Sequence, residues 1–239
     1  MRGLLYKNFF HYRIELIVFA VFQAICTLTV LLLASANNGK TDAMENMIMN
    51  GTLTYAITFF LTGFFESGLF SHDEKPAAMA FLISTPMGAK HHIRSKYLSI
   101  LLINLAVLFC CFLTDTVAVV IADNVAVSLS AVLVIIFSGN MVIEAFSVPF
   151  LVRFGSNHGV GVKGATLGVI CAIVALYVLF GDISMFMEED FLEALAEFFT
   201  QGNIVLMLGM FPFVSMGLYY LSYRISLLLF RKGAESYDG

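Results

Sequence analysis

Six long runs of apolar residues restrict the fold of this chain more than any other feature of its sequence. A helix needs roughly 20 apolar residues to cross a hydrocarbon core about 30 Å thick. None of the runs shows the sustained period-two alternation expected of a membrane β-barrel. The sequence therefore predicts an all-α integral membrane protein with six transmembrane helices, in a single domain covering residues 1–239. The runs are Ile14–Ala34, Thr52–Phe70, Tyr97–Ile121, Val125–Leu151, Gly164–Gly181 and Asn203–Phe230.

Composition excludes a soluble domain. Charged residues make up 13% of the chain, against about a quarter in a typical soluble protein. The net charge of −4 is mild, and nothing in it indicates a nucleic-acid partner. All four cysteines lie inside apolar runs and form no CxxC pair, so they are interpreted as small core residues and not as a disulfide frame or metal site. They are Cys26, Cys110, Cys111 and Cys171.

Lysine and arginine gather on one side of the predicted topology. If six helices alternate in direction, Lys40 alone falls on the other side, and short loops rich in basic residues face the cytoplasm. Both termini are therefore expected in the cytoplasm, with the chain in a cell membrane, the inner membrane of a bacterium. The basic residues on this side are Arg2, Lys7, Arg13, Lys75, Lys90, Arg94, Lys96, Arg153, Lys163, Arg224, Arg231 and Lys232.

Two further segments have an amphipathic pattern. Residues 1–13 mix leucine and phenylalanine with basic residues, which predicts a helix on the anionic inner leaflet. Residues 184–200 place apolar residues at helical spacing opposite acidic ones, which predicts a helix at the outer interface. We expect the acids there, Glu188, Glu189 and Glu193 among them, to favour capture or release of cationic amphipathic molecules.

Ionisable residues inside transmembrane helices are costly and usually face protein or water. Glu66, Asp115 and Glu144 qualify, and Glu15 lies at the start of the first run. Glu66 and Glu144 should lie at similar depth near the cytoplasmic side, in a polar cluster that includes Arg13, Arg94 or Arg153. The alternative is that each carboxylate pairs with a neighbouring base or reaches the interface.

Sequence motifs for catalysis are absent. The glycine-rich stretch Gly155–Gly168 lacks the G-K-[ST] ending of a phosphate-binding loop. His72, His91 and His92 have no metal-ligand spacing and are interpreted as a solvated surface. No nucleophile–base pair stands out. The chain is therefore expected not to be an enzyme by itself and to bind no cofactor or metal.

The longest hydrophilic segment, residues 71–96, carries the most specific motifs. Glu66 precedes an acidic–basic cluster at residues 73–75, followed by FLISTPMG at Phe81–Gly88 and HHIRSKYL at His91–Leu98. With the basic amphipathic start and the ending SYRISLLLFRKG at Ser222–Gly233, this order resembles the permease subunits of type-2 ABC exporters. The resemblance covers essentially the whole chain, and among short permeases it extends to exporters of phenol-soluble modulins and antimicrobial peptides.

The resemblance implies a role for that segment. Residues 71–96 would form a cytoplasmic coupling helix that inserts into a separate ATPase subunit, which would bind ATP and Mg²⁺ and carry out the hydrolysis. A smaller contact would come from residues 153–163. A second permease chain, identical or related, would complete the path for an amphipathic peptide. The residues expected to couple are Asp73, Glu74, Lys75, Pro76, Met79, Phe81, Leu82 and Pro86.

Two other functions remain open at this stage. One is a membrane immunity or sensor protein that binds a peptide without transporting it. The other is an ion-driven secondary transporter, which predicts inverted repeats and charges near the bilayer midplane; neither is visible in the sequence.

Overall fold

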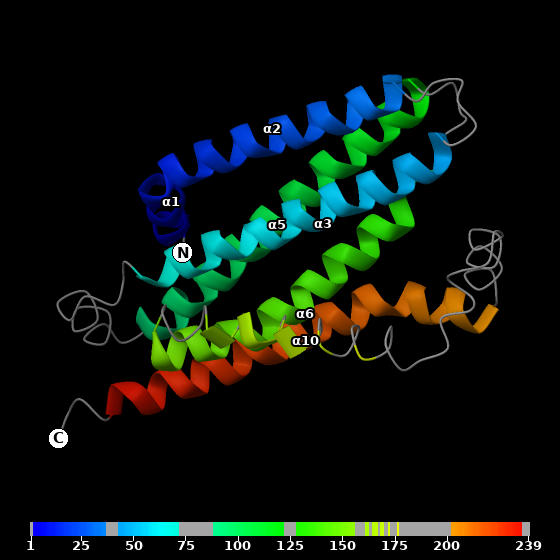
Figure 1. Cartoon of the computed structure of the whole chain (residues 1–239). Coiled ribbons are helices and arrows are strands. Elements are labelled where there is room, and N and C mark those ends of the chain that lie inside the picture. The colour runs from blue at the N-terminus through cyan, green and yellow to red at the C-terminus, as the bar shows by residue number, and fades with distance from the viewer. Residues whose placement is uncertain are drawn as a thin grey trace.

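The computed structural model describes residues 2–36, 43–71, 88–121, 128–155 and 202–235, with individual positions between 161 and 176. Every element bounded in these ranges is an α-helix (Figure 1). The helices are α1 (Arg2–His11), α2 (Arg13–Ala36), α3 (Ala43–Ser71), α5 (Gly88–Ile121), α6 (Ser130–Phe154) and α10 (Gly202–Glu235).

Five of these helices contain a stretch long and apolar enough to cross a membrane. The prediction of an all-helical, multi-pass membrane protein is therefore confirmed at this level. The sixth predicted run, Gly164–Gly181, lies largely outside the described residues. The stretches are Arg13–Ala36, Met49–Phe70, Lys90–Ile121, Ser130–Phe154 and Gly209–Phe230.

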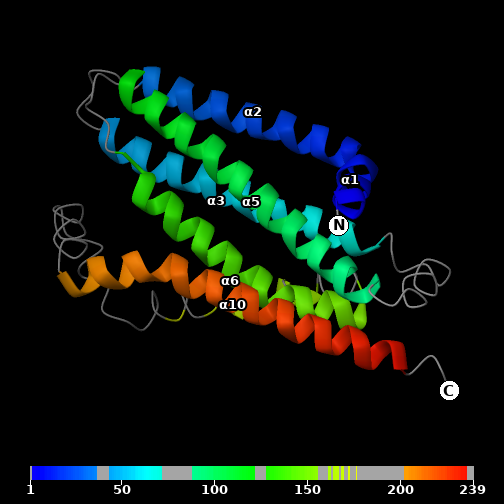
Figure 2. The same cartoon turned by 180° about the vertical axis from the view of Figure 1, so that it is seen from behind.

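Helix α5 is the centre of the described bundle, since it contacts α1, α2, α3, α6 and α10. Helices α6 and α10 run side by side over much of their length (Figures 1 and 2). The short helix α1 lies across one end of the bundle (Figure 1). The start of α5 and the ends of α3, α6 and α10 lie at that same end, which we call the basic end because it carries Lys90, Arg94, Arg153 and Arg224.

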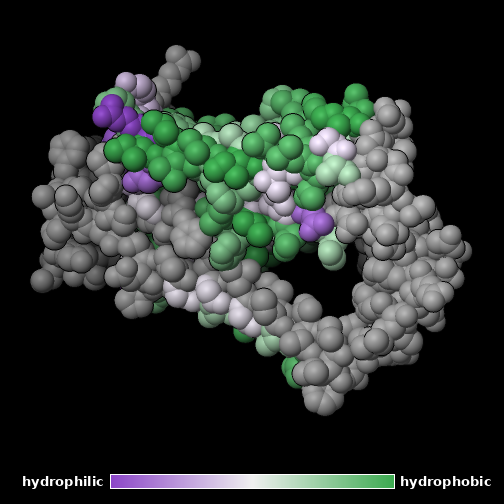
Figure 3. Space-filling model, turned by 45° about the horizontal axis from the view of Figure 1, so that its top comes forward, coloured by the Kyte–Doolittle hydropathy of each residue, from purple (hydrophilic) through white to green (hydrophobic). Residues whose placement is uncertain are grey.

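Apolar side chains of α3, α5 and α6 fill the interior, with Phe59, Ile100, Leu133 and Met141 almost fully buried. Helix α2 is the opposite case, because only 6% of its apolar stretch is buried inside the single chain. Figure 3 shows a hydrophobic surface over the described helices, with the hydrophilic residues mainly near one end. A surface of this kind is stable only against lipid or another apolar chain.

Helix boundaries differ from the predicted runs at several places. Helix α3 begins at Ala43, nine residues before the predicted Thr52. Helix α5 begins at Gly88 and not at Tyr97, so residues 88–96 of the predicted coupling segment are helical. Helix α6 begins at Ser130, five residues later than predicted. It ends at Phe154, where Gly155 adopts φ 88° and its N–H bonds the carbonyl of Leu151, a conformation that favours glycine. Helix α10 extends to Glu235.

Two other expectations are wrong. His92 is 4% exposed and packs with its ring 6.2 Å from the Phe230 ring, because it lies on the face of α5 that is turned to protein. Cys110 is exposed, whereas Cys26 and Cys111 are buried as expected. Cys171, the coupling residues 73–86 and the outer segment 184–200 lie outside the described residues.

Candidate functional site

Polar residues recur at helical spacing on the inward faces of three helices. Helix α3 carries Thr62 and Glu66, four residues apart, and α6 carries Asn140, Glu144 and Ser147. Residues at these spacings share one face of a helix. With Asn104 of α5 they form a single group, which we call the inner polar cluster. Each of the six side chains is 7% exposed or less.

Glu144 is the best-supported carboxylate of the inner polar cluster. The Asn104 side-chain amide donates to both of its oxygens, at 3.0 and 3.1 Å. Asn140 donates to Glu144 Oε1 at 3.1 Å and to Asn104 Oδ1 at 2.9 Å. The Thr62 hydroxyl adds a bond of 3.2 Å to Asn104 Oδ1. A buried carboxylate needs such donors, because an unsatisfied charge in a low-dielectric interior is very costly.

Ser147 links the second carboxylate to the same cluster. Its hydroxyl donates to Glu66 Oε1 at 2.8 Å, and it lies 3.3 Å from the backbone carbonyl of Glu144. The structure thus brings Glu66 and Glu144 into one network that joins α3, α5 and α6. Within a membrane such hydrogen bonds, made between closely packed helices, hold the bundle together.

The arginines expected near these carboxylates are all exposed. The guanidinium of Arg13 lies 5.2 Å from the centre of the Phe10 ring. Arg94 lines a pocket between α5 and α10, and Arg153 lies in the last turn of α6. The hydrogen bonds described above come from amides and hydroxyls instead.

A second polar group lies at the basic end, around the Lys96-Tyr97 pair of α5. Lys96 is 1% exposed, donates to the backbone carbonyl of Leu69 and lies 5.6 Å from the centre of the Phe70 ring. Leu69 belongs to the last turn of α3, whose carbonyls have no partner within the helix and carry partial negative charge. Lys96 therefore fixes the end of α3 to α5.

Tyr97 connects the same turn of α5 to α10. Its hydroxyl lies 2.7 Å from the hydroxyls of both Ser222 and Ser226. Tyr219 donates from its hydroxyl to the backbone carbonyl of Tyr97 at 2.8 Å. The Tyr97 ring also packs against Tyr223 with centroids 5.5 Å apart. We call the contacts of Lys96 with Leu69, and of Tyr97 with Ser222 and Ser226, the Lys96–Tyr97 clasp.

Asp115 lies at the opposite end of the bundle and has a structural role. Both carboxylate oxygens accept the backbone N–H of Leu129 at 3.1 Å, and one accepts the Ser128 hydroxyl at 2.9 Å. Helix α6 begins at Ser130, so Asp115 compensates the positive end of that helix. These hydrogen bonds account for an acidic residue in the apolar stretch of α5.

Sequence reasoning missed the neutral members of these groups. Asn104 and Asn140 carry no charge and lie in apolar runs, and Lys96 was placed in the loop before the third predicted run. Spacing is the signal that could have found such neutral residues. On α10, for example, the buried polar residues recur every three or four positions, at Ser215, Tyr219, Ser222 and Ser226. Among the described residues, no group of three His, Cys, Asp or Glu side chains is placed to hold a metal ion.

Comparison with known proteins places the chain in a described family. A family model described as ABC-2 family transporter protein matches residues 3–231, which is nearly the whole chain. No curated protein and no solved structure matches.

Proposed function

The chain belongs to the ABC-2 transporter family, and from that membership and the Lys96–Tyr97 clasp we propose a specific role within an ABC transporter. As a permease subunit, it associates with ABC ATPase subunits in a membrane. We propose that the ATPase docks on residues 71–96, and that a second permease chain, identical or related, completes the path. The proposed direction is export, from a cytoplasmic basic end.

The clasp is the observation that carries this proposal. Helix α3 ends at Ser71 and α5 begins at Gly88, so a force on the residues between them enters both helices. Lys96 holds the end of α3 against α5, and Tyr97 holds α5 against α10. A push by an ATPase at the basic end would therefore move three helices together and not bend one loop.

Exposure of α2 supports the proposed second permease chain. Seven large apolar side chains of this helix are more than half exposed in the single chain, including Ile17, Val21 and Leu28. This face is available to lipid or to a second chain. The five candidate spans in the described residues also form only a small bundle. Two such bundles, one from each permease chain, would together line the path of the transported molecule.

For the cargo we propose an amphipathic, cationic peptide. The support is the acidic composition of residues 182–197. In the predicted topology this segment lies on the side of the membrane opposite to the one that carries most lysines and arginines. Oppositely charged surfaces raise the local concentration of a ligand and its rate of association. Reversing Glu188, Glu189 and Glu193 together should reduce transport of such a peptide, and unchanged transport would remove this part of the proposal.

The docking proposal is tested by co-purification. The chain is co-expressed with the ATPase encoded nearest its gene, and both retention of the ATPase and ATP hydrolysis in lipid are measured. Glu74→Arg with Phe81→Arg should abolish retention. The matched control, Glu188→Arg with Phe191→Arg, makes the same chemical change in the other hydrophilic segment and should retain the ATPase. Equal retention in both variants would place ATPase docking outside residues 71–96, and no retention even by the unmodified chain would favour the immunity or sensor function.

A further inference from the structure

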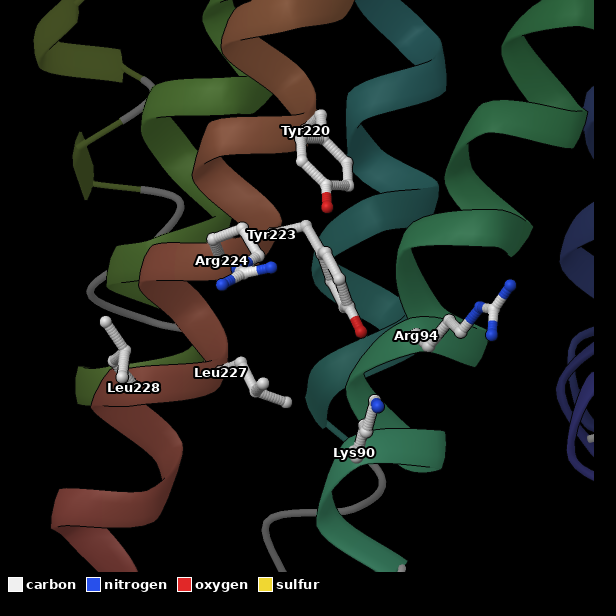
Figure 4. Close-up of a pocket in the computed structure, with 7 residues that line it drawn as sticks. All are labelled: Lys90, Arg94, Tyr220, Tyr223, Arg224, Leu227 and Leu228. Atoms are coloured by element: carbon white, nitrogen blue, oxygen red, sulfur yellow. The ribbon is translucent and has the colours of Figure 1, made fainter.

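A pocket of about 530 Å³ lies at the basic end between the first turns of α5 and the second half of α10 (Figure 4). Each helix contributes one face. Helix α5 contributes residues 90 and 94, and α10 contributes residues 220, 223, 224, 227 and 228. The pocket is not part of the inner polar cluster. Its lining residues are Lys90, Arg94, Tyr220, Tyr223, Arg224, Leu227 and Leu228.

Charge is the first property that indicates a ligand. Three of the seven lining side chains are cationic and none is acidic. No ion pair in the described part of the chain involves Lys90, Arg94 or Arg224. Gathered like charges repel one another, so an anion between them would be bound favourably. Arginine guanidinium groups and a lysine ammonium group are the side chains that proteins use to bind phosphate.

Depth in the membrane is the second property. The pocket lies at the basic end of two candidate membrane spans. The span of α5 begins at Lys90 and the span of α10 ends at Phe230, so both reach the membrane surface at this end. Tyrosine is enriched at this level, where headgroups meet acyl chains. Tyr220 is 60% exposed and Leu228 is 58% exposed, so the pocket opens onto the surface of the single chain. Figure 4 shows Tyr223 projecting from α10 towards α5, with Lys90 at the other end of the same space.

We propose that this pocket binds an anionic phospholipid from the leaflet at the basic end. The phosphate lies among Lys90, Arg94 and Arg224, and the acyl chains follow Leu227 and Leu228 along α10. Basic pockets between transmembrane helices bind lipid headgroups in this way. A free phosphate would satisfy the cations but would leave the apolar side of the pocket uncovered. The proposal goes beyond the proposed function and does not depend on ATPase docking.

The site also adjoins the Lys96–Tyr97 clasp. Tyr223 lines the pocket and packs against the Tyr97 ring at 5.5 Å. A bound lipid would therefore contact α5 and α10 beside the point where Tyr97 joins them. Lipid binding should therefore raise the melting temperature of the chain. Tyr223 would carry this effect, because it lines the pocket and packs against Tyr97.

The test measures lipid binding to the purified full chain by native mass spectrometry. Phosphatidylglycerol is titrated against phosphatidylcholine of the same acyl chains. The variant Lys90→Gln/Arg94→Gln/Arg224→Gln should bind phosphatidylglycerol about 100-fold more weakly, from about fivefold for each basic residue. The control Lys7→Gln/Arg13→Gln/Arg153→Gln loses the same charge outside the pocket and should bind as the unmodified chain does. If the triple variant is unstable, Arg224→Lys is measured as a second variant. It keeps the charge and should therefore retain most of the binding.

Three results would overturn the proposal. Equal loss in the pocket and control variants would show attraction by net charge alone. Competition by glycerol 1-phosphate as effective as that by phosphatidylglycerol would identify a soluble phosphate site. Unchanged lipid binding together with loss of the ATPase in the pocket variant would assign the pocket to protein docking.

Discussion

Replacing Asn104 by leucine should be the most damaging single change to the inner polar cluster. Leucine has nearly the same volume but removes the amide that donates to both oxygens of Glu144 and the carbonyl that accepts from Asn140. Hydrogen bonds to charged groups contribute about 1.5–3 kcal/mol in soluble proteins. Those within membranes contribute about 0.6 and at most about 1.7 kcal/mol. Glu144 keeps Asn140 as a donor, so we expect a loss of about 2–3 kcal/mol.

A loss of that size corresponds to a melting temperature lower by about 5–10 °C for a chain of this length. The chain contains no tryptophan, but it contains four cysteines. Cys26 and Cys111 are buried, so a thiol-reactive dye in detergent reports their exposure on unfolding. Thr116→Val on the exposed face of the same helix is the control and should change the melting temperature little.

A double-mutant cycle with Glu144→Gln isolates the contact itself. Once Asn104 is leucine, Glu144→Gln should cost about 1–2 kcal/mol less than it does in the unmodified chain, because the bond is already lost. Additive effects within about 0.5 kcal/mol would refute a direct contact between the two residues. So would a melting temperature for Asn104→Leu equal to that of Thr116→Val.

Three further changes test the clasp and the helix cap. Tyr97→Phe removes the hydroxyl shared by two serines of α10 and should lower the free energy of unfolding by about 1–2 kcal/mol. The control Tyr220→Phe changes an exposed side chain and should leave the melting curve unchanged. Lys96→Met should uncouple ATP hydrolysis from transport while the ATPase still co-purifies; retained coupling would dismiss the clasp as a transmission element. Asp115→Asn should cost about 1 kcal/mol by weakening the cap of α6, and transport per folded molecule should stay the same.

Apolar length predicted the five described helices that are long and apolar enough to cross a membrane. Hydropathy averages report whether about 20 residues can lie in lipid, and α2, α3, α6 and α10 each contain such a stretch. The same averages placed the starts of both α3 and α5 nine residues late. His92, Ser95, Lys96 and Ser99 are polar, yet they are buried on one helical face against protein. Hydropathy cannot distinguish a polar loop from a helix that buries its polar groups.

The inner polar cluster was only half visible in the sequence. Its carboxylates were found because charge is rare in a membrane helix. Asn104 and Asn140 carry no such signal, and which partner each carboxylate meets depends on how α3, α5 and α6 are rotated. Helix rotation is fixed by packing across the bundle, here through Ser147 and Asn104, and is not encoded in any single run of residues.

Photo-crosslinking from position 81 tests the permease proposal most directly. A benzophenone-bearing phenylalanine replaces Phe81 in one sample and Phe191 in the other, and both are irradiated in membranes that contain the neighbouring ATPase. The proposal predicts a crosslink of the combined mass of permease and ATPase from position 81 and none from position 191. Crosslinking from neither position, or equally from both, would contradict docking of the ATPase on residues 71–96.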